Sequence, residues 1–173
     1  MIRLLAPAAA FAAAALAAHF AVLHALPGLI MTRAMQRLEA SGAPANGFTV
    51  APRMTPQTQT VVRPSPDLAY SICLFDISDS PAMIEADPWP DYASLSIYDA
   101  RTDNVAVVSL SGDDGGHYTM EIGLAGRDAP TPGRVLVDKP RGVALIRRLA
   151  PTAEAHLRAS AVAARDSCEA SAR

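Results

Sequence analysis

The hydrophobic and polar positions divide the chain into two parts with different periodicities. From Leu4 to Met31 the residues are almost all apolar, and no charged side chain occurs between Leu4 and Thr32. A helix needs about 20 apolar residues to cross about 30 Å of hydrocarbon, so this segment predicts a transmembrane helix. The helical pattern continues beyond it, and we expect residues 1–40 to form an anchor with a helical extension.

A cleavable signal peptide is the alternative interpretation of this segment. Ala15-Leu16-Ala17 resembles an A-x-A cleavage site, and Arg3 would supply the basic region that precedes the apolar run. Cleavage there would leave a long apolar stretch, ending at Met31, at the new N-terminus. We therefore favour an uncleaved, single-pass membrane anchor.

The flanks of the apolar segment and its two histidines bear on orientation and partners. Arg3 and the terminal amine on one side are nearly balanced by Arg33 and Arg37 on the other. This charge distribution slightly opposes a periplasmic C-terminal domain and does not decide the orientation. His19 and His24 are the strongly polar side chains inside the span. His19, nearer the middle, is a candidate for contact with a partner helix; alternatively, each imidazole bonds to neighbouring backbone.

The second part of the chain has short alternating runs that are typical of β-strands. Residues 41–57 are rich in Gly, Pro, Ala and Thr and indicate a linker, and residues 58–150 form the expected β domain. Short strands separated by turn-forming residues favour an antiparallel β-sandwich or barrel. The predicted strands are Thr58–Val62, Ala69–Ile77, Ala82–Ala86, Tyr92–Asp99, Val105–Leu110, Tyr118–Ile122, Arg134–Val137 and Val143–Arg147.

Residues 151–173 are expected to form a C-terminal helix and tail. Thr152 is a suitable N-cap. The spacing of Leu157, Ala161, Ala164 and Cys168 places these four on one helix face. If that face packs on the β domain, Cys168 meets Cys73 of the first long strand, and we expect a disulfide in an oxidising compartment. Two reduced thiols are the alternative.

Charge and motifs exclude several classes of function. Three of the 15 basic residues and one of the 17 acidic residues precede residue 41, which leaves 12 and 16 and a net charge of −4 in the remainder. Nucleic-acid binding is therefore not expected, because it requires a basic surface. No nucleotide-binding or hydrolase motif occurs, and the scattered His and Cys residues indicate neither a metal site nor a cofactor.

A proline-rich turn before the first long strand is the best candidate site. It places Asp67 at the start of the strand that carries Tyr70, with Arg63 as a counter-charge. In the functional interpretation these residues bind a ligand or partner at one end of the β domain, and Asp67 and Tyr70 are the catalytic candidates. In the structural interpretation Asp67 accepts backbone N–H bonds of the turn and the ring of Tyr70 is buried. Arg147 and Arg148 indicate a solvated strand edge or a salt bridge at the end of the sheet.

Four segments resemble a bacterial family known as domain of unknown function 1254. They are RPSPDLAYSICLFDIS, WPDYASLSIYDARTDNVAVVS, GGHYTMEI and VLVDKPRGVALIRRLAP, within Val61 to Pro151. The most specific pattern is N-x-D-T-x-Y-S before a hydrophobic strand that ends in D-L/I-S. Asp67, Tyr70, Ser71 and Asp76 match this pattern, whereas Ser65 and Leu68 replace its Asn and Thr.

The resemblance implies a mostly β domain and carries no established reaction. Longer members of the family have a second module, domain of unknown function 1214, which implies a separate chain with that module as a partner. We expect a bacterial inner-membrane protein with a periplasmic β domain that binds a partner protein or a small ligand. The alternative is an envelope enzyme, hydrolytic in type, that uses Asp67 and Tyr70.

Overall fold

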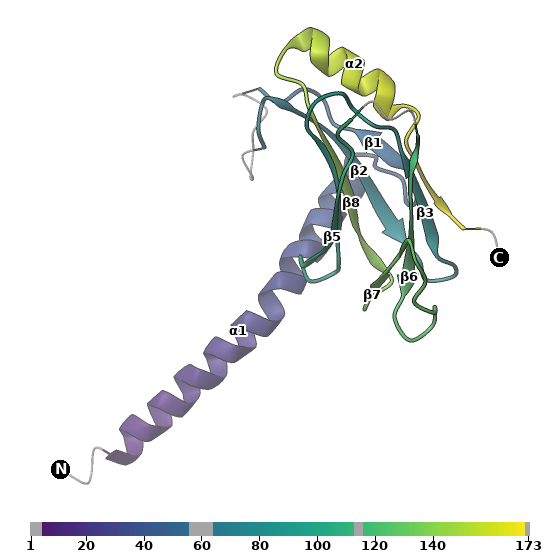
Figure 1. The fold of residues 1–173 in the computed structure, drawn as a ribbon. Coiled ribbons are helices and arrows are strands. Elements are labelled where there is room, and N and C mark those ends of the chain that lie inside the picture. Colours follow the sequence, from purple (N-terminus) through teal and green to yellow (C-terminus); the bar gives the residue numbers. More distant parts are fainter. Residues whose placement is uncertain (1–4, 56–63, 113–115, 172–173) are drawn as a thin grey trace.

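The fold is an open β-sandwich with a long N-terminal helix and a short C-terminal helix (Figure 1). The structure is a computed structural model that describes residues 5–55, 64–112 and 116–171. It confirms the predicted mainly β class in its sandwich form, because the sheets do not close into a barrel. The elements are α1 Leu5–Ala40, β1 Phe48–Val50, β2 Leu68–Asp76, β3 Ala82–Ala86, β4 Ala93–Tyr98, β5 Asn104–Ser109, β6 Tyr118–Leu124, β7 Arg134–Val137, β8 Arg141–Leu149, α2 Ala153–Ala163 and β9 Ser167–Ala170.

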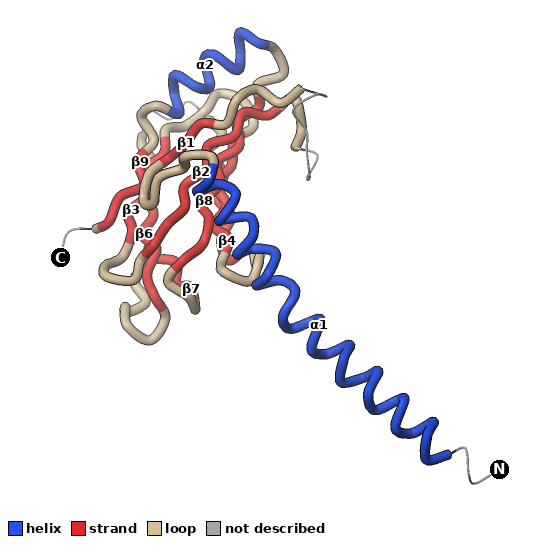
Figure 2. The backbone as a smooth tube through the Cα atoms, turned by 180° about the vertical axis from the view of Figure 1, so that it is seen from behind, coloured by secondary structure: helices blue, strands red, loops and turns tan. Residues whose placement is uncertain are grey.

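The two sheets pack face to face around one core. The five-stranded sheet has the order β1-β2-β8-β4-β5 and the four-stranded sheet has the order β7-β6-β3-β9 (Figure 2). Neighbouring strands are antiparallel except β6 and β7, which are parallel. Side chains alternate between the two faces of a strand, so every second residue points into the core. Fully buried examples are Phe75, Ile84, Leu95, Ile97, Ile122 and Ile146.

Helix α1 has an exposed half and a packed half. Its 36 residues include Pro27, and the residues up to Leu26 are exposed and, apart from His19 and His24, apolar. By length and composition, it is long and apolar enough to span a membrane. Farther along, Met31 and Met35 are buried against Leu74 and Val143 on the outer face of the five-stranded sheet. The helix is therefore continuous from its apolar arm into the domain.

One strand lies in the segment that we assigned to a linker. Residues Phe48–Val50 form β1 and pair with β2, with Phe48 opposite Cys73. Three residues between Gly and Pro are too few to show an alternating pattern, so the sequence did not reveal this strand. The predicted strand Thr58–Val62 lies outside the described residues.

The C-terminal helix is shorter than predicted. Thr152 is the N-cap as expected, and its hydroxyl accepts the N–H of Ala155. The predicted buried face is wrong, because Leu157 is 72% exposed while Ala155 and Ala159 are buried. The helix ends at Ala163, and the chain then turns and forms β9, which carries Cys168. The face of α2 that packs on the sandwich therefore consists of small alanine side chains, and Leu157 lies on the opposite, exposed face.

The predicted disulfide between Cys73 and Cys168 is confirmed, although a strand delivers Cys168 instead of a helix. Cys73 belongs to β2 of one sheet and Cys168 to β9 of the other, with Cα atoms 6.5 Å apart. Both residues are buried in the core. The bond therefore joins the two sheets and closes a loop between residues 95 positions apart in sequence.

A buried ion pair joins the same two parts of the domain. Arg148 of β8 is 1% exposed, and its guanidinium donates to both carboxylate oxygens of Asp166 at 2.8 Å. It also donates to the carbonyl of Asp87 at 3.0 Å. Burial raises the pKa of Asp166, while the Arg148 guanidinium acts in the opposite direction. The expectation of a solvated edge is thus wrong for Arg148. The alternative expectation, a salt bridge, is confirmed, and its partner Asp166 lies in the turn before β9.

We predict that replacing Asp166 by alanine lowers the free energy of unfolding by about 3–5 kcal/mol, because the buried guanidinium of Arg148 loses its carboxylate. Urea unfolding followed by circular dichroism measures this change. Glu154→Ala is the control, because Glu154 pairs with Arg158 on the exposed surface of α2 and such pairs contribute about 0–1 kcal/mol. Equal effects of the two variants would contradict the prediction.

Candidate functional site

The outer face of the five-stranded sheet carries a groove that α1 leaves open. Tyr70 of β2 and Arg147 of β8 are opposite one another in register, and both point away from the core. The groove has a volume of about 570 Å³. Its walls are mostly apolar and consist of Ala51, Met54, Pro64, Ser65, Leu68, Tyr70, Ile72, Tyr92, Leu145 and Arg147.

A second apolar hollow continues the groove toward the end of α1. Its volume is about 430 Å³, and it shares Ala51, Met54 and Ile72 with the first. Leu38 of α1 and Ala43 of the following turn line its other side. The two hollows together form one surface that leads from the C-terminal end of α1 to Arg147.

Arg147 is the charged side chain of this groove. Its guanidinium is half-buried and donates a 2.7 Å hydrogen bond to the hydroxyl of Tyr98. No ion pair joins Arg147 to a carboxylate within the described part of the chain. The positive charge is therefore held at the groove without a counter-charge from the residues that the structure describes.

Hydroxyl groups lie near Arg147, on β4 and on the residue before it. The Tyr92 and Ser94 hydroxyls are 3.1 Å apart and share a hydrogen bond. Ser96 is 1% exposed, and its hydroxyl has no hydrogen-bond partner among the described residues. In the register of β4 and β8, Ser96 lies between the rows that contain Arg147 and Tyr98, so the bond between these two residues spans its position. A buried hydroxyl without a partner is uncommon in folded proteins.

The structure separates the residues that the sequence grouped into one site. Tyr70 lines the groove, and its hydroxyl accepts the N–H of Ser65 at 2.8 Å. Asp67 is exposed at the start of β2 and is not a lining residue. Arg63 lies outside the described residues, and His19 lies on the exposed arm of α1. The roles proposed for these residues stay predictions.

The structural interpretation of Asp67 also changes. The backbone N–H of Asp67 donates to the Ser65 hydroxyl at 3.3 Å, so Ser65 supplies the acceptor that we expected from a carboxylate. The carbonyl of Asp67 accepts the N–H of Ala150. Among the described residues no hydrogen bond reaches the Asp67 carboxylate. Tyr70 is half-buried, in partial agreement with the expected buried ring.

Sequence reasoning missed Arg147, Tyr92 and Tyr98 as members of one site. Each strand shows its own alternation, but the sequence does not indicate that β8 is inserted between β2 and β4. That order brings Arg147 between Tyr70 and Ser94. The signal in the sequence that could have pointed to this site was an arginine at an outward position of a predicted strand.

A second polar cluster lies at the end of the sandwich near α2. Asp87 is buried and receives His117 Nδ1 at 2.5 Å and Arg165 Nε at 2.5 Å on its two carboxylate oxygens. A hollow of about 370 Å³ adjoins these three residues. An imidazole bound in this way resembles a general base, but no described hydroxyl or thiol is hydrogen-bonded to it. We therefore assign the cluster a structural role beside the Arg148–Asp166 pair.

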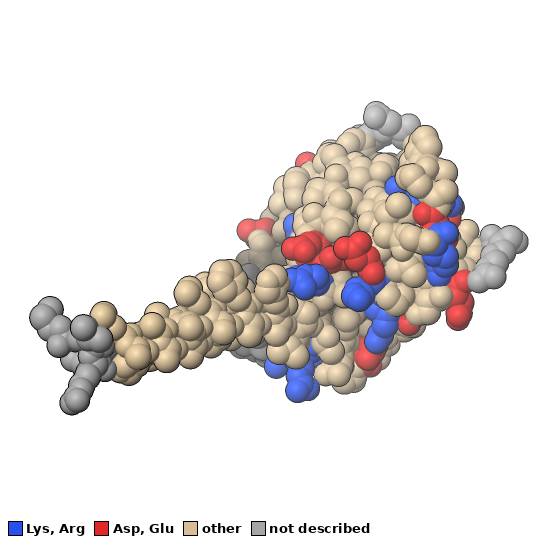
Figure 3. Space-filling view, turned by 90° about the horizontal axis from the view of Figure 1, so that it is seen from below, with Lys and Arg blue, Asp and Glu red and all other residues tan. Residues whose placement is uncertain are grey.

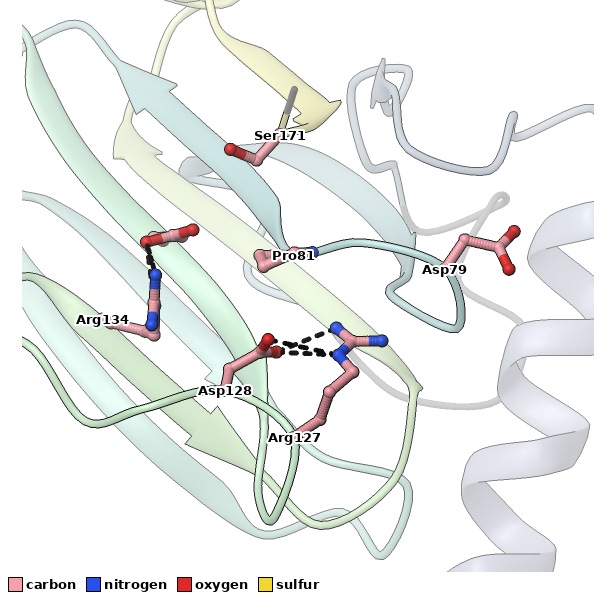
Figure 4. Close-up of a pocket in the computed structure, with 7 residues that line it drawn as sticks. Asp79, Pro81, Arg127, Asp128, Arg134 and Ser171 are labelled. Carbon is pink, nitrogen blue, oxygen red and sulfur yellow. Dashed lines mark hydrogen bonds and ion pairs between the residues drawn. The ribbon is translucent and has the colours of Figure 1, made fainter. Parts of the chain in front are cut away.

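A fourth hollow, of about 430 Å³, opens among ion-paired side chains (Figure 4). Arg127 pairs with Asp128 and also donates to the carbonyls of Ile77 and Ser78. Its hydrogen bonds lower the pKa of the Asp128 carboxyl. These contacts attach the loop after β6 to the turn after β2. Because its arginines are already paired, this hollow is a weaker ligand site than the groove.

No cluster of three potential metal-ligating side chains occurs in the described ranges. Residues 45–169 match the family described as a protein of unknown function, DUF1254. The chain belongs to this family. The match covers the β domain, α2 and nearly all of β9 and confirms the resemblance of the four sequence segments.

Two solved structures resemble this DUF1254 protein. The VPA0106 protein from Vibrio parahaemolyticus aligns over 83% of this chain with 13% identity and a TM-score of 0.62. A putative uncharacterized protein from Burkholderia cenocepacia aligns over 73% with 12% identity and a TM-score of 0.45. The chain spans about a third of each of these proteins, 35% and 36%. The first similarity supports the fold, and no protein with a curated function matches the sequence.

We predict that Tyr70→Phe lowers the free energy of unfolding by about 0.5–1.5 kcal/mol, because the half-buried N–H of Ser65 loses its acceptor. Asp67→Ala should change it by less than about 0.5 kcal/mol, because this side chain is exposed. Chemical unfolding of both variants measures the difference. A larger loss in Asp67→Ala than in Tyr70→Phe would restore the original structural interpretation of Asp67.

Proposed function

We propose that this protein is a single-pass membrane protein whose β domain is fixed close to the membrane surface and binds a ligand in the groove beside Arg147. The observation that carries the proposal is the continuity of α1. Its exposed half is apolar and uncharged, and its other half packs on the sheet that forms the groove. Figure 3 shows this arm without charged side chains up to its junction with the domain.

The length of the exposed arm matches a bilayer. Residues Leu5 to Leu26 span about 33 Å at a rise of 1.5 Å per residue, close to the thickness of the hydrocarbon layer. Just beyond this arm, Gly28 lies against the carbonyl of Ala100 in the β4–β5 turn, with an added Cβ 3.9 Å from that oxygen. The domain thus begins where the apolar arm ends, and in a membrane-inserted chain the β4–β5 turn would lie beside the lipid headgroups.

We further propose that the membrane is the bacterial inner membrane and that the β domain is periplasmic. The disulfide between Cys73 and Cys168 supports this compartment, because disulfides persist in oxidising surroundings and are rare in the cytosol. The flanking arginines are nearly balanced and do not oppose either orientation strongly. Pairing with a chain that carries the 1214-type module stays a prediction.

We favour binding over catalysis as the activity of the groove. Asp67 and Tyr70, the catalytic candidates, do not converge, because Asp67 is exposed outside the groove that Tyr70 lines. A hydrolase needs a nucleophile beside a base or a metal-bound water. The groove instead combines apolar walls with one cation and several hydroxyl groups, a composition typical of small-ligand sites.

We expect the full-length chain to stay in the membrane pellet after alkaline carbonate washing, because α1 supplies a complete span. In spheroplasts, added trypsin should digest the β domain, while a cytosolic marker protein stays intact. Mass spectrometry of the pellet identifies the N-terminus. A soluble species that begins near Ala18, or a β domain protected until the spheroplasts are lysed, would contradict the anchor or the orientation, respectively.

A further inference from the structure

We propose that the groove binds a single-chain fatty acid, with its carboxylate on Arg147 and its hydrocarbon chain along the two apolar hollows. This inference deepens the proposed function and rests on it in one respect, because the adjacent membrane is the source of the ligand. Three observations carry it: the ion pairing of the arginines, the hydroxyl groups beside Arg147 and the shape of the hollows.

Arg147 differs from the other arginines that are removed from solvent. Four arginines are buried or half-buried in the described part of the chain. Arg134 pairs with Glu121, Arg141 with Glu39 and Asp76, and Arg148 with Asp166, whereas Arg147 pairs with no carboxylate of the described residues. Removing a cation from water is unfavourable unless an anion compensates it. The missing partner therefore points to an anionic ligand group at this position.

The groups beside Arg147 suit a carboxylate. A guanidinium presents several N–H donors in one plane and binds two carboxylate oxygens at once. The Tyr98 hydroxyl accepts the present hydrogen bond from Arg147, so its own proton is available for a ligand oxygen. The unpartnered Ser96 hydroxyl lies on the same sheet face, between the rows that contain Arg147 and Tyr98, and is a further donor. These donors all favour an anion over a neutral or cationic group.

The rest of the groove suits a hydrocarbon chain. Most lining residues carry no charge, and the two hollows of about 570 and 430 Å³ each fall within the range of small-molecule sites. They are joined at Ala51, Met54 and Ile72, so one extended molecule can occupy both. A sugar or nucleotide would leave its hydroxyl or base edges against apolar walls without partners. A single alkyl chain meets no such cost.

The full chain in lipid nanodiscs provides a direct test. A palmitic acid that carries a photoreactive diazirine is added, the sample is illuminated, and labelled peptides are identified by mass spectrometry. We expect labels on residues 68–74 and 143–147 in addition to α1. Unlabelled palmitic acid should compete for the groove label, while palmityl alcohol should compete at least about tenfold less well, because it lacks the charge.

Variants separate the charge from the apolar surface. Arg147→Gln should reduce groove labelling at least about tenfold, Arg147→Lys should retain part of it, and Arg158→Gln, on the exposed surface of α2, should leave it unchanged. Labelling of α1 is the internal reference. A melting temperature close to that of the parent confirms that Arg147→Gln is folded, as expected for a side chain outside the core.

The possible failures are distinguishable. Labels confined to α1 in a chain that is inserted in the discs would overturn the fatty-acid site and leave the membrane anchor standing. Equal groove labelling of the parent and Arg147→Gln, or equal competition by the acid and the alcohol, would overturn the carboxylate pairing. A chain that does not enter the discs would overturn the proposed membrane function and, with it, the membrane source of the ligand.

Discussion

The packing of α1 on the outer face of the five-stranded sheet is the contact on which the rest of the arrangement depends. Met31 and Met35 bury their side chains against Leu74 and Val143, and the Glu39–Arg141 ion pair adds a second attachment nearby. Without this contact the apolar arm would be connected to the domain only through a flexible segment. With it, the arm and the domain form one body, so that in the proposed function the membrane would determine where the domain lies.

The same contact shapes the groove. The C-terminal part of α1 covers one end of the outer sheet face and contributes Leu38 to the wall of the second hollow. The other end of that face stays open, with Tyr70 and Arg147 on neighbouring strands. In an ordinary sandwich the outer face of a sheet is solvated. Here α1 covers one part of that face, and the uncovered part forms a mostly apolar groove. The groove is a consequence of helix packing as much as of the strands.

Two internal connections compensate for a modest core. Aromatic residues make up 5% of the chain, and many core positions are alanine. Small side chains bury little apolar area and contribute correspondingly little free energy. The Cys73–Cys168 disulfide joins the two sheets, and the Arg148–Asp166 pair holds the turn before β9 against β8. Both connections hold the segment that follows α2, one in the turn before β9 and one in β9 itself.

The sequence predicted what depends on local pattern and missed what depends on strand order. The span of α1, most strands of the β domain and the Thr152 cap follow from periodicity and capping chemistry. Alternation along β8 separates Arg147 from Arg148, but nothing local assigns Arg148 to Asp166 or Arg147 to the groove. Likewise, the pairing of Cys168 was predicted, but the end of α2 at Ala163 was not.

The claim that α1 and the β domain form one rigid body is tested most directly by a distance measurement across Pro27. Spin labels introduced at Leu23 on the arm of α1 and at Leu157 on α2, two positions whose side chains are exposed in the structure, would be measured by double electron–electron resonance in nanodiscs. The packing of Met31 and Met35 predicts a single narrow distance distribution. A broad or multi-peaked distribution would show a hinge between the membrane arm and the domain and would contradict the account.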